Sequence, residues 1–292
     1  GQKTSGEEIR NSDMLETFLE GPGVELEHFD CLPGRRSMVA RIQGTDPTAP
    51  ALCLMGHTDV VPVSPDGWSR DPFGGELVAG EVWGRGAVDM LNLTSSMAVA
   101  FRNCIKTGFR PKGDLVYFGV ADEEAGGTYG AKWMAEHHWD AIKADFVLTE
   151  FGGLPTPTPN GKKLTVAAGE KGLGWRRLTV KGTPGHGSMP FGADNAVLKA
   201  AEIIRRLGDY RPSPKLTEMW QHQVSTLNLT DEVKAALLNP ETVWETIATL
   251  DAPGLAGHLH ACSHTTFSPN VVHGGVKTNV IPDVVEIEVD IR

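Results

Sequence analysis

Three short runs of apolar residues constrain the fold of this chain more than any other feature. They cover residues 51–55 (ALCLM), 114–121 (DLVYFGVA) and 145–149 (DFVLT). Each run is short and has the nearly continuous apolar character of a strand that is covered on both faces. Helical patterns accompany them over residues 8–20, 93–106 and 128–138. Strands that alternate with helices predict an α/β domain with a mostly parallel sheet flanked by helices.

A different pattern predicts a second, smaller domain. Apolar and polar residues alternate over 172–181, 264–273 and 283–291, and an amphipathic helix is expected over 195–207. This order predicts an α+β domain whose antiparallel sheet is open to water on one face. Residues 208–262 are richer in polar and helix-forming residues and are interpreted as an insertion. We therefore expect domains at 1–168 and 169–292.

Composition excludes several classes of protein. The chain has 37 acidic and 27 basic residues, a formal net charge of -10 and no Lys/Arg-rich stripe, so we expect no nucleic-acid partner. Its four cysteines form no CxxC pair, which argues against a zinc–thiolate site. The apolar runs are too short to span a bilayer, so no membrane partner and a cytoplasmic location are expected.

The first candidate site follows the strand at 51–55. His57 and Asp59 lie in the sequence Gly-His-Thr-Asp, and ligands bind at the carboxyl ends of strands in open α/β sheets. His57 can direct one ring nitrogen into a cleft, while Asp59 holds the other and makes the imidazole a better metal ligand. The alternative is a capped turn with a hydrogen-bonded histidine.

Further acids follow at comparable places. Asp89 ends a glycine-containing loop and can bridge two cations, although an acidic helix N-cap is the alternative. Glu123 and Glu124 belong to an Asp-Glu-Glu run after the strand at 114–121, where three acids repel one another unless a cation lies among them. One glutamate can ligate while its neighbour acts as general base; a solvated acidic loop is the alternative. Glu150 follows the strand at 145–149.

Together, these residues predict a metal centre with mixed nitrogen and oxygen ligands. One histidine and several carboxylates at the ends of different strands form a ligand set that suits zinc. Two bridged ions can polarise a carbonyl group and activate water, and a nearby carboxylate that does not ligate can carry the proton. The joint pattern is more specific than any of its parts.

The order of the motifs resembles a known family. GHTDVVP, WGRGAVDM, DEEAGG, TE, GTPGHGS and NVIP occur in series between about Gly34 and Arg292. This series is similar to that of acetylornithine deacetylase, succinyl-diaminopimelate desuccinylase, aminoacylase and glutamate carboxypeptidase. The resemblance implies that His57 and Glu150 hold one metal, Asp89 bridges both and Glu124 holds the other. It also implies that Glu123 is the general base and that Asp59 orients His57.

The resemblance extends into the second domain. His186 matches a histidine that reaches the active site of the neighbouring subunit and stabilises the oxyanion, which implies a homodimer. Asn279 matches a substrate-binding position near the same oxyanion. The second domain is therefore expected to be a lid and dimerisation domain.

The chain also departs from the family pattern. Family members continue beyond the strand at 283–291, complete the lid and supply a final histidine ligand, so we expect the C-terminal part of both domains to be missing. The remaining histidines lie in the lid or its insertion, and none matches this ligand: His258, His260, His264 and His273. We interpret His260 and His264 as part of a polar loop rather than a metal cluster.

The sequence thus predicts a hydrolase of amide bonds in peptides or N-acyl amino acids that uses two divalent ions. Zinc is the expected metal, with cobalt and manganese as alternatives. Exopeptidase and deacylase activities stay open, because both cleave the same kind of bond. The alternative function is a non-catalytic binding or scaffold protein that retains the fold and lacks the last metal ligand.

Overall fold

The chain forms two compact units, each with its own sheet and core. The computed structural model describes residues 6–64, 66–151, 153, 155–158, 160–167 and 169–292. The units are Gly1–Phe151 and Gly152–Arg292. Their division falls earlier than the boundary at residue 168 that the sequence pattern indicates.

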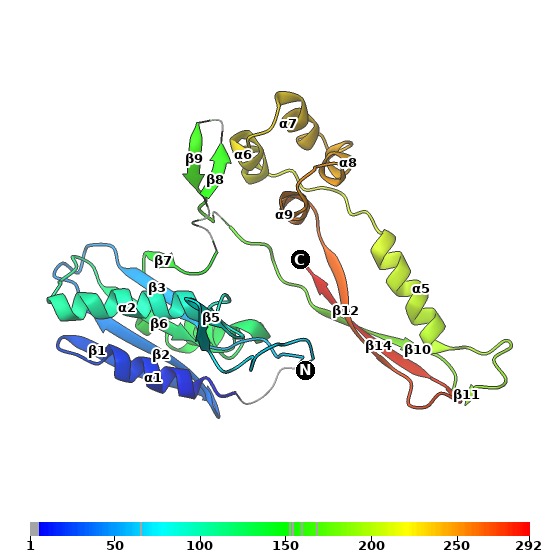
Figure 1. The fold of residues 1–292 in the computed structure, drawn as a ribbon, viewed down its shortest axis with the longest axis horizontal. Helices are drawn as coiled ribbons and strands as arrows, with labels where there is room; N and C mark the ends of the chain where they lie inside the picture. The colour runs from blue at the N-terminus through cyan, green and yellow to red at the C-terminus, as the bar shows by residue number, and fades with distance from the viewer. Residues whose placement is uncertain (1–5, 65, 152, 154, 159, 168) are drawn as a thin grey trace. The chain divides into compact units, whose positions relative to one another are not determined.

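A five-stranded sheet organises the first unit (Figure 1). Its strands, in spatial order, are β1 (Val24–Leu32), β2 (Arg35–Ile42), β6 (Leu115–Val120), β3 (Leu52–His57) and β7 (Phe146–Leu148). β3 pairs in parallel with β6 and β7, whereas β2 is antiparallel to both β1 and β6. The expected α/β domain with parallel strand pairing is therefore present, but the sheet is mixed, because only β3, β6 and β7 pair in parallel. The tight Pro33–Gly34 turn explains the antiparallel pairing of β1 with β2, because strands joined by such a turn pair only in antiparallel fashion.

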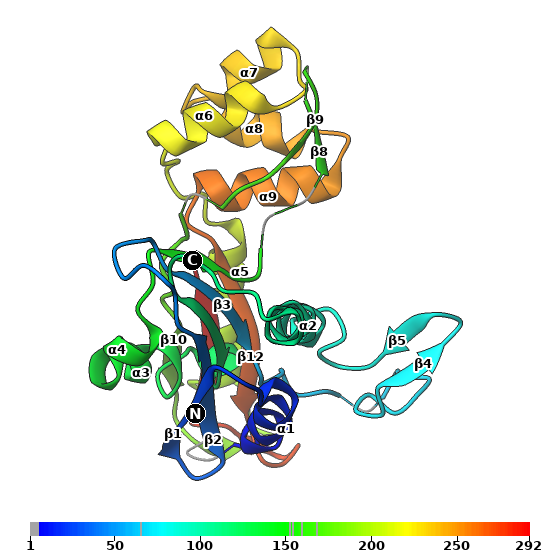
Figure 2. The ribbon, with the colours of Figure 1, turned by 90° about the vertical axis from the view of Figure 1, so that its left-hand side faces the viewer.

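Helices cover both faces of this sheet. Figure 2 shows α1 (Ile9–Leu19) and α2 (Leu91–Thr107) on one side and α3 (Ala131–His137) and α4 (Trp139–Ile142) on the other. Tyr117 of β6 packs against Phe101 of α2, with 6.1 Å between ring centroids. The next residue, Phe118, belongs to the opposite core cluster with Met134 of α3. Successive strand residues point to opposite faces, so two cores explain the continuous apolar run in β6.

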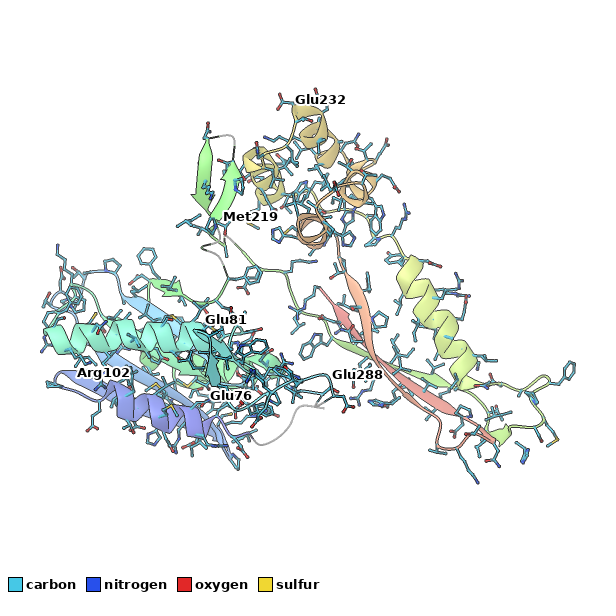
Figure 3. All side chains as sticks on the ribbon, viewed as in Figure 1. Glu76, Glu81, Arg102, Met219, Glu232 and Glu288 are labelled. Carbon is cyan, nitrogen blue, oxygen red and sulfur yellow. The ribbon has the colours of Figure 1, made fainter. Side chains whose placement is uncertain are left out.

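Smaller elements border the sheet of the first unit. A 3-10 turn, η1 (Glu123–Ala125), follows β6 directly. The hairpin of β4 (Glu76–Val78) and β5 (Glu81–Trp83) extends away from the sheet in Figure 2, and Glu76 and Glu81 mark it in Figure 3. The sequence analysis did not predict this hairpin.

The second unit contains an antiparallel sheet, as expected. Its spatial order is β10 (Arg176–Lys181), β14 (Val284–Ile291) and β12 (Phe267–Gly274). Helix α5 (Ala196–Asp209) packs its apolar residues against one side of this sheet. The opposite side bears polar pairs, such as Arg177 and Glu288, which are 2.6 Å apart (Figure 3 labels Glu288).

The insertion at 208–262 folds largely into helices with a core of their own. They are α6 (Glu218–Thr226), α7 (Asp231–Leu237), α8 (Val243–Ala248) and α9 (Pro253–Ser263). Trp220, Leu237 and Leu259 are almost completely buried among them. Four further short strands complete the unit: β8 (Pro155–Thr158), β9 (Gly161–Leu164), β11 (Gly185–His186) and β13 (Val280–Ile281). Across the described part of the chain, no helix combines the length and apolar character needed to cross a bilayer.

Candidate metal centre

His57 is the last residue of β3, and both neighbouring elements fix its position. The next residue, Thr58, donates its amide to Val120 O at 2.9 Å, which continues the contact with β6. Thr94 of α2 donates its hydroxyl to His57 O at 2.9 Å. A Cβ on Gly56 would lie 2.5 Å from Thr94 Oγ1, so this close approach of α2 requires glycine. Sequence reasoning did not single out Thr94, whose only signal was a threonine near the start of a helix.

The hydrogen bonds of His57 determine which ring nitrogen is available. Its Nδ1 lies 3.0 Å from the carbonyl oxygen of Asp59, which can only accept, so Nδ1 carries the proton of the neutral ring. The other ring nitrogen, Nε2, lies 3.1 Å from Asp89 Oδ1. It is also 3.7 Å from Oε2 of Glu123 and 3.7 Å from Oε2 of Glu150. The buried imidazole therefore directs a donor atom toward three carboxylates.

Asp59 connects two of the loops. Its carboxylate Oδ1 lies 3.6 Å from His57 Nδ1, farther than its own carbonyl oxygen. The two carboxylate oxygens accept the backbone amides of Glu123 and Glu124, at 3.1 Å and 3.0 Å. Burial raises the pKa of Asp59, against the lowering effect of His57 and these amides. Asp59 thus ties the loop after β3 to the turn after β6.

The structure brings all five predicted metal-site and base residues together. The described residues include two groups of potential ligand atoms within 4.8 Å of one another: His57, Asp89 and Glu124, and His57, Glu123 and Glu150. Asp89 precedes α2, Glu123 and Glu124 lie in η1, and Glu150 follows β7. Glu123, which we expected to act as a base, is as close to His57 Nε2 as Glu150 is.

The electrostatics of the cluster favour a bound cation. Burial raises the pKa of Glu124 and of Glu150, and the neighbouring carboxylates of Asp89 and Glu123 raise both further. Burial lowers the pKa of His57, but the Asp59 carbonyl and the surrounding acids outweigh it and raise the pKa overall. Negative charge gathered around one imidazole contributes to all three shifts, and a divalent ion would offset this charge. The donor set of imidazole and carboxylates fits such an ion.

The two predicted residues of the second unit lie on neighbouring strands. His186 ends β11, and Asn279 immediately precedes β13. Gly187 donates its amide to Asn279 O at 2.8 Å, and a Cβ on Gly187 would lie 3.0 Å from the Asn279 backbone. His186 is exposed, and its Nδ1 lies 2.7 Å from Ser188 Oγ. The structure therefore brings His186 and Asn279 together within this unit.

The interpretation of His260 and His264 as a polar loop is wrong. His260 lies in α9, and His264 is its C-terminal cap. Their rings stack with centroids 4.9 Å apart, and both meet Trp244 at right angles. Helical i, i+4 spacing places both on one side, and packing against Trp244 orders the segment. Neither histidine belongs to a group of three potential metal ligands among the residues that the structure describes.

This stacked pair predicts that the insertion is less stable in acid. Burial lowers the pKa of both imidazoles; His260 lowers that of His264 further, and Lys171 lowers both. The folded state therefore binds fewer protons than the unfolded state. The neutral imidazoles of His260 and His264 contribute their full stabilisation above the ordinary imidazole pKa of about 6.5. This contribution declines as the pH falls below that value toward the lowered pKa of the folded state.

Hydrogen exchange in peptides that cover α9 tests this prediction. After correction for intrinsic exchange rates, the opening free energy should be lower at pH 5.5 than at pH 7.5 in the wild-type chain. The double variant His260→Gln/His264→Gln should show a smaller difference between the two pH values. An equal pH dependence in both proteins would contradict the assignment to these imidazoles.

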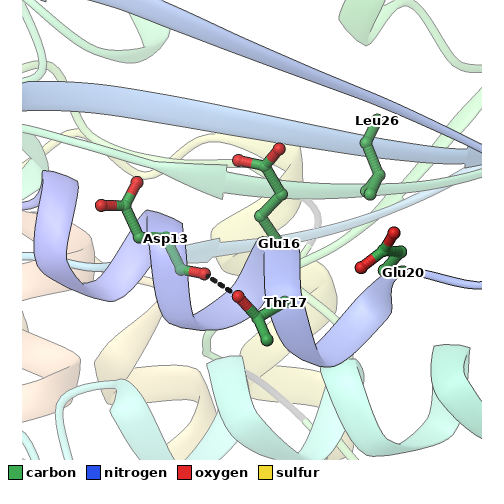
Figure 4. Close-up of a pocket in the computed structure, with 5 residues that line it drawn as sticks. All are labelled: Asp13, Glu16, Thr17, Glu20 and Leu26. Atoms are coloured by element: carbon green, nitrogen blue, oxygen red, sulfur yellow. Dashed lines mark hydrogen bonds between the residues drawn. The ribbon is translucent and has the colours of Figure 1, made fainter.

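A small pocket beside α1 contains other acids (Figure 4). Asp13, Glu16 and Glu20 line it from α1 together with Thr17, and Leu26 contributes from β1. Thr17 donates its hydroxyl to Asp13 O at 2.9 Å. Asp13 pairs with Arg36 at 2.8 Å, and among the described residues the groups of potential metal ligands do not include the acids of this pocket.

A mixed α/β sheet beside which one imidazole and four carboxylates gather defines the class of α/β proteins with a candidate site for divalent ions. The comparison with known families agrees with this class. The model of peptidase family M20/M25/M40 matches residues 53–268, and the chain belongs to this family.

The matches to individual relatives cover only part of each relative's length. The chain is 34% identical to aminoacylase-1 from Sus scrofa over 74% of this chain and 53% of the relative. It is 32% identical to succinyl-diaminopimelate desuccinylase from Cereibacter sphaeroides over 68% of this chain and 51% of the relative. The chain thus spans about half the length of these curated relatives.

Solved structures share the fold. The dipeptidase Dug1p from Saccharomyces cerevisiae has a TM-score of 0.69 and 19% identity, over 99% of this chain and 66% of that one. The M20 metallo-carboxypeptidase Sso-CP2 from Sulfolobus solfataricus has a TM-score of 0.67 and 21% identity, over 98% of this chain and 65% of that one. These matches confirm the mixed α/β architecture.

Proposed function

We propose that this chain provides the metal site of a hydrolase that cleaves the amide bond of N-acyl amino acids. The observation that carries the proposal is the position of His57 Nε2, which lies within 3.1 to 3.7 Å of carboxylates from three separate loops. The more similar relatives are named as an acylase and a desuccinylase, which supports an N-acyl substrate over a dipeptide. A non-catalytic scaffold gains no support, because it has no use for such a concentration of acids.

Each site residue has a role in this proposal. His57 and Glu150 would hold one divalent ion and Glu124 a second, with Asp89 available to both; we propose zinc. When bound, the ions would polarise the substrate carbonyl and lower the pKa of water. Glu123 takes the proton from the attacking water and delivers it to the leaving nitrogen.

The two compact units have different roles in this scheme. The first unit is the catalytic domain, and the second is a lid and dimerisation domain. His186 stabilises the oxyanion in the site of a partner chain, and Asn279 binds substrate beside it. Mixing inactive Glu123→Gln and His186→Ala chains should then restore activity, because a mixed dimer contains one intact site. Absence of recovery in a proven mixed dimer would contradict action in trans.

Metal content is the direct test of the proposed site. The chain would be loaded with zinc, dialysed and measured by elemental analysis beside a His57→Ala variant. We expect two ions per wild-type chain and a clear loss in the variant, and the loaded protein should release amino acids from N-acyl amino acids faster than from dipeptides. Zinc retention equal to that of the variant would overturn the proposed site. Faster cleavage of dipeptides would correct the substrate class.

A further inference from the structure

A buried arginine connects the N-terminal helix to the acidic turn of the metal centre. Arg35 is the first residue of β2, and its side chain is only 6% exposed. Its NH1 group donates to Glu8 Oε1 at 2.6 Å and lies 2.8 Å from Asp122 Oδ1. The side chains of Glu8 and Asp122 are 5% and 0% exposed. One guanidinium thus bridges the residue before α1 and the residue before Glu123.

Asp122 determines the path of the turn that carries Glu123 and Glu124. Its backbone is left-handed, with φ 67°, which is uncommon for a residue with a side chain. Its Oδ2 accepts the amide of Tyr129 at 2.8 Å, and its carbonyl oxygen accepts the amide of Gly127 at 2.7 Å. A shift of Asp122 would therefore move both glutamates relative to His57.

The N-terminal helix also contacts the other loop of the site. Asn11 of α1 donates its amide to Thr58 O at 2.7 Å, next to His57. Burial raises the pKa of Glu8, while the nearby Arg35 guanidinium lowers it. The helix is therefore attached to the loop after β3 through Asn11 and to the turn after β6 through Arg35.

We propose that Arg35 is a positioning residue that sets the place of Glu123 and Glu124 relative to His57 and so determines metal affinity. This inference rests on the proposed function in one respect, namely that Glu124 is a metal ligand. If Arg35 formed only a stabilising ion pair, its loss would lower the stability of the first unit without a specific effect on the metal site.

Arg41 offers a matched control on the same strand. It is also largely buried, and its NH1 lies 2.5 Å from Asp114 Oδ2. The control Arg41→Met thus removes a less buried ion pair on the same strand, which does not contact the metal-site loops. Zinc affinity would be measured by competition with a chromophoric chelator, at a temperature where all variants are folded.

Arg35→Met should bind zinc about 10–100-fold more weakly than the wild type, as is usual when a residue that supports metal ligands is lost. Arg35→Lys should recover part of the lost zinc affinity. If Arg35→Met does not fold, the comparison of Arg35→Lys with Arg41→Met provides the test. Arg41→Met should stay within about threefold of the wild type. Equal zinc affinities of the Arg35 and Arg41 variants would overturn the positioning role.

A second measurement separates this inference from the proposed function. If the wild-type chain binds no zinc, the proposed metal site fails, and hydrogen exchange of the metal-free proteins still tests Arg35. The amides of Glu123, Glu124 and Tyr129 should lose protection in Arg35→Met and keep it in Arg41→Met. Unchanged protection in Arg35→Met would overturn the inference.

Discussion

Replacing Glu123 by glutamine should lower turnover by about 10²–10⁴-fold while zinc binding stays close to that of the wild type. Glutamine preserves the shape of the side chain but cannot accept and release the proton that the reaction moves. The backbone amide of residue 123 would still donate to the Asp59 carboxylate, so the turn should keep its position. Turnover of N-acyl amino acids and zinc content would be measured on the same preparation.

This variant also distinguishes a base from a ligand. Glu123 Oε2 lies 3.7 Å from His57 Nε2, the same distance as Glu150 Oε2. If Glu123 were chiefly a ligand, zinc content would fall together with turnover. Glu136→Gln is a suitable control, because Glu136 lies on α3 and approaches Lys132 at 3.9 Å on the surface. Unchanged turnover in Glu123→Gln would rule out its role as general base.

Replacing Asp89 by asparagine should have opposite effects on the metal-free and zinc-loaded proteins. Without metal, the substitution removes a charge that contributes to the raised pKa of Glu124 and Glu150, so the midpoint of thermal unfolding should rise by about 2 °C. With zinc, the lost bridging oxygen should lower affinity by at least about 100-fold.

Thermal unfolding with a chelator and with excess zinc checks both signs in one series. The exposed residue Asp283, in the second unit, provides the control Asp283→Asn, which should behave like the wild type under both conditions. A fall in the metal-free midpoint of Asp89→Asn would show that charge repulsion does not dominate there. Wild-type zinc affinity in this variant would exclude Asp89 as a ligand.

The sequence was most informative where periodicity is strong. The predictions for α1, α2, β6, α5 and β14 agree with the structure to within a few residues at each end. β1 was missed because Glu25, Glu27 and Asp30 are poor strand formers, and hydrogen bonds to β2 supply what local propensity lacks. β2 is buried on both faces, so its pattern alone does not separate an antiparallel strand from a parallel one.

Tertiary packing accounts for the other failures. The segment around His260 and His264 contains two glycines and little helical periodicity, yet packing against Trp244 places it in a helix. The gathering of His57, Asp89, Glu124 and Glu150 follows from their places after strands or before a helix, which the sequence reveals. The ion pair of Arg35 with Glu8 and Asp122 joins residues far apart in the chain, and no local pattern marks it.

The order of strands in the first unit has a consequence during synthesis on the ribosome. β3 lies between β6 and β7, and both of these strands come later in the chain. The nascent polypeptide therefore carries the apolar residues of β3 with no partner on either side until β6 has left the exit tunnel. An unpaired apolar strand invites association with other chains. Chaperone protection is consequently most valuable between the emergence of β3 and the emergence of β6 from the tunnel.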